Sequence, residues 1–176
     1  MAAGYRFEVH VADVDETPQP GERADELVVR LARAKASAVA ALHTSGHVLG
    51  GDTVVVRDGE ILGKPNDSAA AGEMLRSLAG REHEVLSGVA LIDAATGLDV
   101  HGLARSRVAM DLVSPETLAD YLAGDEWRGK AGAYAIQGDA GAFMHLQHGE
   151  LDTVIGLPVK LVRQLFERLG TGEHAS

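Results

Sequence analysis

The chain has 176 residues, of which 45% are hydrophobic, and this is enough apolar surface for one domain with its own core. Cysteine is absent, which excludes disulfides, thiolate metal sites and cysteine nucleophiles. The net charge of -10, with acidic residues spread along the chain, disfavours a nucleic-acid polymer as partner. We expect a single domain over residues 1–176 without signal peptide or membrane span, which by default places it in the cytoplasm.

The first predicted element is a strand over residues 6–11, where polar and apolar side chains alternate. An acidic loop follows, and apolar residues at three- and four-residue intervals then predict a helix over residues 24–42. Residues 48–56 form a β-rich apolar run closed by Asp58-Gly59, which predicts a hairpin that returns through Ile61-Leu62.

The rest of the chain mixes helices and strands in the same way. Hairpin signals occur together with helical crossovers, so we expect an α/β fold around one mixed β-sheet. The predicted elements are a helix capped by Asn66 or Asp67 and ended by Gly80, strands over residues 85–92 and 98–112, a helix between Ser114 and Gly124, short strands over residues 134–136 and 143–146, and a last helix with Pro158 at its first position.

Asp52 is the first candidate for chemistry, because it lies inside a predicted strand, where Asp is disfavoured and a buried carboxylate is costly. The neighbouring Gly50 and Gly51 would let a ligand approach the backbone closely. Asp52 is therefore either a base or metal ligand, or a strand-end residue that bonds to local amides.

Two other segments could contact a phosphorylated ligand. Lys64 can bind phosphate as a point charge or be a solvated loop lysine, and Pro65 after it excludes a P-loop. Residues 127–138 combine glycines, a cation and an amide, which suits close approach to a ligand but also a tight turn before a strand. In the first case Gln137 can donate to and accept from one base edge.

Metal ligation has weaker signals. The cluster of Asp13, Asp15 and Glu16 could bind a hard cation through oxygen ligands, but it lacks the EF-hand spacing, and such a cluster alone is more often a solvated turn. Two histidine pairs have no third ligand nearby and are interpreted as surface residues: His43 with His47, and His145 with His148.

Taken together and in order, the motifs resemble those of the Maf-like nucleoside triphosphate pyrophosphatases, from about Gly4 to Leu169. Several ordered motifs with sensible spacing are far more specific than any single one. The matching segments are Asp13-Val14-Asp15-Glu16, residues 30–36, Gly51-Asp52-Thr53-Val54-Val55, Leu62-Gly63-Lys64-Pro65, Ser87-Gly88-Val89, residues 130–138 and Gly156-Leu157-Pro158.

The resemblance implies an enzyme that cuts a nucleoside triphosphate between its α and β phosphates. It would release the monophosphate and pyrophosphate with the help of a divalent metal cation, Mg²⁺ or Mn²⁺. The implied fold is similar to that of the inosine triphosphate pyrophosphatases, with a long mixed β-sheet flanked by helices and a cleft between two lobes. Whether the protein forms a homodimer stays open.

The resemblance also implies roles for particular residues. Asp52 matches the Asp of the family's Ala-Asp-Thr motif, with Gly51 in place of Ala, and would accept a proton from the attacking water and contact the metal. Thr53 and Gln137 match positions that mark the dTTP/UTP subgroup. The other matched positions are Glu16 for the metal and Lys35, Lys64 and Lys130 for the phosphates. A base, an oriented water and positive charge on the departing pyrophosphate are what such a reaction requires.

Two segments depart from the family pattern. The family begins with a strand and a Ser-x-Ser-Pro-Arg-Arg loop that grips the phosphates, and the sequence as given starts at Met1, beyond that loop. Near the other end, residues 149–153 replace the usual Gly-Ser-Tyr-Ser-Asn and add two carboxylates. From the first departure we expect weak activity and a tendency to associate.

Three functions stay open at this point. The first is hydrolysis of dTTP and UTP, and the second is a nucleotide-binding regulatory protein that has lost turnover. The third is a pyrophosphatase with another base preference, such as 7-methyl-GTP or a modified nucleotide. Translation of the DNA upstream of Met1 would separate the first two, and a nucleotide panel would identify the third.

Overall fold

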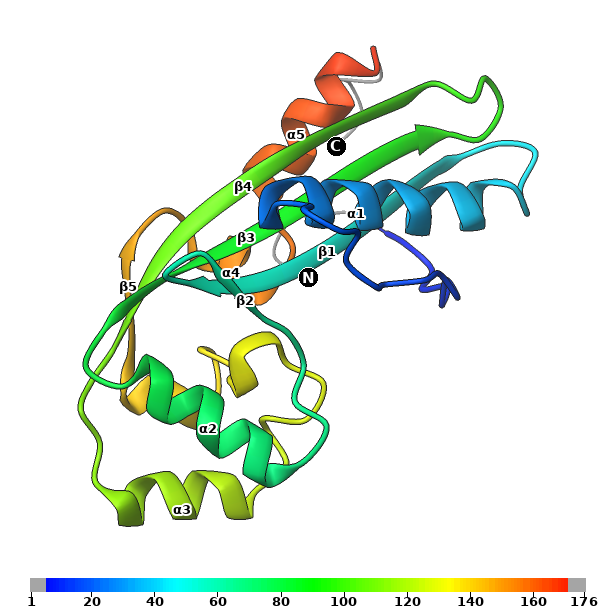
Figure 1. The fold of residues 1–176 in the computed structure, drawn as a ribbon. Coiled ribbons are helices and arrows are strands. Elements are labelled where there is room, and N and C mark those ends of the chain that lie inside the picture. The colour runs from blue at the N-terminus through cyan, green and yellow to red at the C-terminus, as the bar shows by residue number, and fades with distance from the viewer. Residues whose placement is uncertain (1–5, 171–176) are drawn as a thin grey trace. The chain divides into compact units, whose positions relative to one another are not determined.

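The computed structural model describes residues 6–170, which form helices and strands along most of their length (Figure 1). The elements in chain order are α1 (Ala24–Ala40), β1 (His47–Arg57), β2 (Glu60–Leu62), α2 (Ser68–Leu78), β3 (Glu82–Asp93), β4 (Asp99–Met110), α3 (Pro115–Ala123), the 3₁₀ turns η1 (Ala131–Ala133) and η2 (Asp139–Ala142), β5 (Met144–His148), α4 (Leu151–Ile155) and α5 (Val159–Arg168).

The five strands form one antiparallel sheet in the order β2-β1-β3-β4-β5. Val55 of β1 faces Leu62 of β2, and Met110 of β4 faces Met144 of β5. The expected α/β fold, with helices flanking the sheet, is confirmed. Neighbouring strands alternate in direction more regularly than the expected mixed sheet suggested. The chain returns through α3 antiparallel to β4, whereas α2 links β2 to β3, which lie on either side of β1.

Local signals account for most of the boundaries. Asp58 and Gly59 both adopt left-handed backbone conformations, with φ of 51° and 83°, as a tight hairpin turn between antiparallel strands requires. Asp67 caps α2 by accepting the amide of Ala70 at 2.8 Å. Gly80, with φ of 70°, follows that helix. The predicted hairpin and the predicted α2 cap are confirmed.

Two predicted strands are wrong. Residues 6–19 lie outside every helix and strand of the described chain, and Phe7, Val9 and Val11 are 61%, 82% and 96% exposed. Alternation predicts a strand only where a sheet edge pairs with it, and this segment does not join the sheet. Residues 134–136 enter a turn instead, because the amide of Gly138 bonds to Ala135 O at 3.0 Å.

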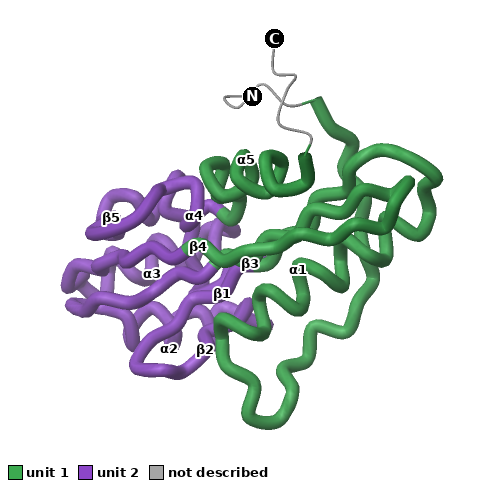
Figure 2. Tube along the Cα trace, turned by 90° about the horizontal axis from the view of Figure 1, so that it is seen from above, with its two compact units in different colours: residues 1–52, 87–104, 156–176 green, residues 53–86, 105–155 purple. Residues whose placement is uncertain are grey.

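The chain divides into two compact units (Figure 2). Unit 1 contains residues 1–52, 87–104 and 156–176, and unit 2 contains residues 53–86 and 105–155. Strands β1, β3 and β4 contribute residues to both. The implied cleft between two lobes, and the expectation of a single domain over residues 1–176, stay predictions.

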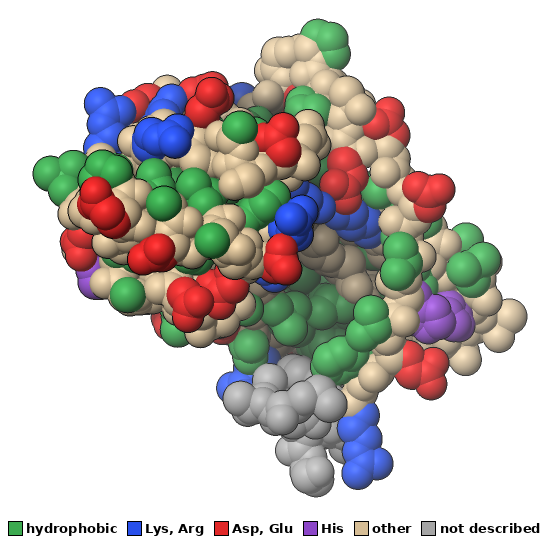
Figure 3. All heavy atoms as spheres, turned by 90° about the horizontal axis from the view of Figure 1, so that it is seen from below, with side chains coloured by type: hydrophobic (Ala, Val, Ile, Leu, Met, Phe, Trp, Pro, Cys, Tyr) green, Lys and Arg blue, Asp and Glu red, His purple; other side chains and the backbone are tan. Residues whose placement is uncertain are grey.

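No helix within residues 6–170 has both the length and the apolar composition needed to cross a membrane. On the face drawn in Figure 3, Lys and Arg side chains lie next to Asp and Glu side chains. The described residues include no group of three or more histidines and carboxylates placed to hold a metal ion by themselves.

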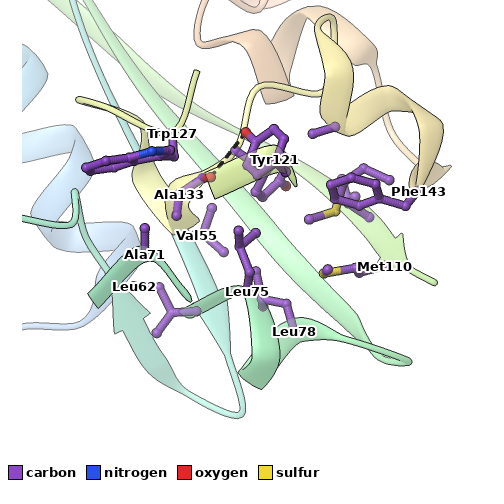
Figure 4. Packing of buried hydrophobic residues seen from close by; sticks show 14 of the residues in the cluster. Val55, Leu62, Ala71, Leu75, Leu78, Met110, Tyr121, Trp127, Ala133 and Phe143 are labelled. Carbon is purple, nitrogen blue, oxygen red and sulfur yellow. Dashed lines mark hydrogen bonds between the residues drawn. The ribbon is translucent and has the colours of Figure 1, made fainter. Parts of the chain in front are cut away.

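Each unit has its own hydrophobic core. In unit 2, α2, α3 and η1 pack on the sheet around Leu75 and Leu78, as Figure 4 shows. In unit 1, one face of the sheet packs on Val162 and Leu165 of α5 and the other on α1. The main buried members of the unit 2 core are Val55, Leu62, Ala71, Leu75, Leu78, Val85, Val108, Met110, Leu118, Tyr121, Trp127, Ala133, Tyr134, Ala140, Phe143 and Met144.

Two glycines let α1 lie directly on the strands of unit 1. A Cβ added to Gly50 of β1 would collide with Ala32 O and come within 2.7 Å of Ala36 N. A Cβ added to Gly88 of β3 would collide with Val28 O in the same way. Backbone meets backbone here, so any side chain at either position would push the helix off the sheet.

Gly88→Ala should therefore lower the free energy of unfolding by about 2 kcal/mol or more, because the helix backbone cannot give way as a flexible side chain would. Gly51→Ala is the matched control on β1. Its added methyl would make ordinary contacts, at 3.7 Å from Gly88 O and from Gly156 O, and should change the free energy of unfolding by less than about 1 kcal/mol. Urea titration of both variants measures this. Equal effects of the two substitutions would show that the packing of α1 on the sheet does not require a glycine at residue 88.

Candidate active site

The contact of α1 with the sheet brings Lys35 to Asp52. Lys35 Nζ lies 2.7 Å from Asp52 Oδ1 and 2.6 Å from Glu16 Oε1. The Lys35 and Asp52 side chains are 18% and 9% exposed, so this is a largely buried ion pair, whereas Glu16 is 44% exposed. Three residues that the sequence singled out separately therefore meet in unit 1.

The charges of this cluster support one another. Burial alone would lower the pKa of Lys35, but its hydrogen bonds to Asp52 and Glu16 outweigh burial and raise that pKa above its ordinary value. Lys35 is therefore an ammonium at neutral pH, and its positive charge favours the ionised form of the Asp52 carboxylate. A carboxylate in that state can accept a proton.

A second ion pair fixes the acidic loop against α1. Arg30 donates from Nε to Glu22 Oε1 at 2.6 Å and from Nη2 to Glu22 Oε2 at 2.8 Å, and Nη2 also reaches Thr17 O at 3.1 Å. The hydrogen bonds from Arg30 lower the pKa of Glu22 to about 2. Because Thr17 directly follows Glu16, this clamp holds the Glu16 backbone beside Lys35. Arg30 has no role that can be recognised from the sequence, because its pairing with Glu22 spans the loop and no local spacing indicates it.

The cluster suits a hard cation only in part. Glu16 and Asp52 offer carboxylate oxygens, the ligand type that Mg²⁺ prefers, and Mg²⁺ is often held by one or two carboxylates plus substrate phosphates. Such an ion would have to share both carboxylates with Lys35. The two residues therefore fit a cation that arrives with phosphate oxygens rather than a permanent metal centre.

Two of the matched motifs contact the backbone next to Asp52. Gly51 lies with its Cα near Gly88 O and Gly156 O, where a Cβ would meet each oxygen at 3.7 Å. Gly156 itself has φ of 108°, a conformation that favours glycine. The strand that carries Asp52 thus packs against two of the matched motifs. These are Ser87-Gly88-Val89 on the neighbouring strand β3 and Gly156-Leu157-Pro158 just before α5.

Unit 2 holds the other candidates: Thr53 on β1, Lys64 after β2, and Lys130 and Gln137 on either side of η1. The amide of Gly132 donates to Gly63 O at 3.1 Å, which ties the loop of Lys64 to the loop of Lys130. Both lysines and Gln137 are exposed, and Thr53 is half-buried. The structure thus brings together the loops that carry Lys64 and Lys130. The roles of these four side chains stay predictions.

The segment from Lys130 to Gly138 has an unusual backbone. Gly132 and Ala133 both have positive φ, 67° and 65°, and a left-handed alanine is strained. A Cβ on Gly132 would also press on Val55 at 2.8 Å. Backbone strain of this kind is often retained at functional sites. Residues 127–138 can therefore form a tight turn and also contact a ligand, so the two alternatives given for this segment are compatible.

A buried histidine anchors this segment and was missed by the sequence analysis. His83 Nε2 and the Tyr134 hydroxyl lie 2.7 Å apart, and His83 is 3% exposed. Burial lowers the pKa of His83 to about 4. The alternation of Glu82, His83, Glu84 and Val85 at the start of β3 could have placed His83 inside, but no pattern indicates a partner 51 residues away. The four histidines interpreted as surface residues are all exposed, as predicted.

The family model described as "Maf-like protein" matches residues 1–169. The chain belongs to the Maf-like protein family. The match covers all of the candidate residues described above.

Several relatives of this Maf-like protein carry the name dTTP/UTP pyrophosphatase. The chain is 46% identical to the one from Rhodospirillum rubrum, over 84% of this chain and 70% of that protein. It is 41% identical to the one from Pelotomaculum thermopropionicum, over 95% of this chain and 87% of that protein. It is 44% identical to the Escherichia coli protein, over 89% and 79% respectively.

The free energy of unfolding of this Maf-like protein should decrease as the pH is lowered, because of His83. Its pKa in the folded state, about 4, lies below the ordinary 6.5, so the unfolded chain binds the proton more readily between these values. Stability from the neutral imidazole is complete above pH 6.5 and is lost as the pH falls toward 4. Between pH 7.5 and pH 5 the loss should be about 2 kcal/mol.

Urea unfolding of the wild type and of His83→Gln at both pH values tests this. Glutamine can still bond to the Tyr134 hydroxyl but does not titrate, so the variant should lose that part of the pH dependence whatever its absolute stability. The same pH dependence in both proteins would mean that His83 is protonated as easily in the folded state as in the unfolded one.

Proposed function

We propose that this Maf-like protein is a nucleoside triphosphate pyrophosphatase, a hydrolase that converts dTTP and UTP to the monophosphate and pyrophosphate. The observation that carries the proposal is the buried pair of Asp52 and Lys35, 2.7 Å apart on a glycine-lined strand. The shared name of the relatives supports the substrates, since they are 41% to 46% identical to this chain over most of its length.

In the proposed reaction a water oxygen bonds to the α-phosphorus of the nucleoside triphosphate. The bond from that phosphorus to the bridging oxygen breaks, and pyrophosphate leaves with the bonding electrons. Asp52 orients the water and takes its proton. General-base catalysis of this kind accelerates a reaction by about a hundredfold or more. The ammonium of Lys35 holds Asp52 in its ionised form until the proton arrives.

The remaining residues bind the substrate. Lys64 and Lys130, on loops tied through Gly63 and Gly132, would place positive charge on the phosphates. A divalent cation, Mg²⁺ or Mn²⁺, held by Glu16 and Asp52 would neutralise charge on the departing pyrophosphate. Thr53 and Gln137 would select the base, with the Gln137 amide able to donate and accept at one edge.

The setting of this activity is part of the proposal. Nucleoside triphosphates are cytoplasmic metabolites, which supports a cytoplasmic location. The net charge of -10 disfavours a nucleic-acid polymer as partner. A homodimer is compatible with the proposal but is not required by it, because every residue given a role lies within one chain.

Asp52→Asn should lower kcat by at least about a hundredfold with dTTP or UTP, because the amide keeps the shape of the carboxylate but cannot take the proton. Release of pyrophosphate, followed as phosphate after inorganic pyrophosphatase is added, measures the rate. Asp25→Asn on the first turn of α1 is the control, since Asp25 bonds to the exposed Arg23 and to the Glu26 amide and has no role in the proposed reaction. Turnover of Asp52→Asn within about tenfold of the wild type would remove Asp52 as the base.

Gln137→Glu should weaken pyrimidine nucleotides selectively. A carboxylate loses the amide's donor and faces the carbonyl oxygens of the base with negative charge. Because Gln137 is exposed, the fold should be unaffected. kcat/KM for dTTP and UTP, compared with that for a purine nucleotide, gives the answer, and an equal loss for every nucleotide would exclude Gln137 from base recognition.

A further inference from the structure

Glu126, which has no role in the function proposed above, lies against the backbone that carries Gln137. The amide of Asp139 donates to Glu126 Oε2 at 2.9 Å. A Cβ added to Gly138 would collide with Glu126 Oε1 and come within 2.5 Å of its Cδ. The Glu126 carboxylate therefore occupies the space that a side chain at residue 138 would fill, immediately after Gln137.

Glu126 is itself held in place by its neighbour. Trp127 is 2% exposed and belongs to the unit 2 core drawn in Figure 4. Its indole Nε1 donates to Gly124 O at 2.9 Å and to Leu122 O at 3.2 Å, so the backbone on the N-terminal side of Glu126 is fixed to α3. The carboxylate thus extends from a rigid part of unit 2.

The other hydrogen bonds given for the turn around Gln137 are local, while Ile136 and Ala140 on either side of it pack in the unit 2 core. The amide of Gly138 bonds to Ala135 O at 3.0 Å, and the amide of Gly141 bonds to Gly138 O at 2.9 Å. Both bonds are local to the turn, whereas the bond to Glu126 joins it to a segment 13 residues away. The Gln137 side chain is exposed, so packing does not orient it and the backbone must do so.

We propose that Glu126 is a positioning residue for base selection, which fixes the turn at residues 137–139 so that the Gln137 amide meets the base in one orientation. The inference rests on the proposed function, because it assigns Gln137 to the base. The bond from the Asp139 amide to a carboxylate is charge-assisted and stronger than a neutral one. Without it the turn can rotate, and Gln137 loses its fixed direction while the core beneath it stays intact.

The test compares Glu126→Ala with Glu126→Gln. Glu126→Ala removes the acceptor and should lower kcat/KM for dTTP and UTP by about tenfold, with purine nucleotides changed by less than about threefold. Glu126→Gln keeps an acceptor oxygen at the same place and should restore most of the loss. In a Gln137→Ala background, Glu126→Ala should change the ratio of pyrimidine to purine kcat/KM no further, because Glu126 acts through Gln137.

A uniform loss for all nucleotides, or a full additional effect in the Gln137→Ala background, would overturn the proposal and leave Glu126 with a structural role only. Binding keeps this result separate from the proposed function. Dissociation constants of dTTP and GTP, measured by calorimetry with Asp52→Asn and with Asp52→Asn/Glu126→Ala, need no turnover. Loss of the dTTP preference in the second protein supports the positioning role even if the wild type hydrolyses neither nucleotide, and an unchanged preference contradicts it.

Discussion

The direct contact between α1 and the strands beneath it is the constraint on which the candidate site depends. Gly50 and Gly88 carry no side chain, so the helix backbone lies against β1 and β3. At that separation Lys35 reaches Asp52 at 2.7 Å and both are largely buried. A helix displaced by one methyl group would lengthen this ion pair and let water between the charges, which weakens their interaction.

The same contact determines how the acidic loop is used. A buried carboxylate is stable only when it is paired, and Asp52 is paired with Lys35. Arg30, five residues before Lys35 on α1, holds the loop through Glu22 and Thr17 and so presents Glu16 to the same ammonium. Two cations of α1 thus hold three carboxylates, those of Glu22, Glu16 and Asp52, and a phosphate-bound cation would enter a site in which Glu16 and Asp52 are already oriented.

The sequence predicted the parts of the molecule that follow from local rules. The hairpin at Asp58-Gly59 and the Asp67 cap were predicted because they depend on neighbouring residues. Asp52 was recognisable as an acid in an apolar strand, and Lys35 only through the family resemblance. The strand over residues 6–11 was wrong because alternation carries no information about a partner. Glu126 and His83 act across 13 and 51 residues, and no spacing predicts such contacts.

The most direct test of the central claim is ³¹P NMR of the products formed from dTTP and Mg²⁺ by the wild type and by Lys35→Met. The account predicts equal amounts of monophosphate and pyrophosphate from the wild type. The variant should form almost none, since Asp52 loses the charge that keeps it ionised and oriented. Nucleoside diphosphate and orthophosphate as products, or full turnover by a folded Lys35→Met protein, would contradict the claim that this buried ion pair forms a pyrophosphatase site.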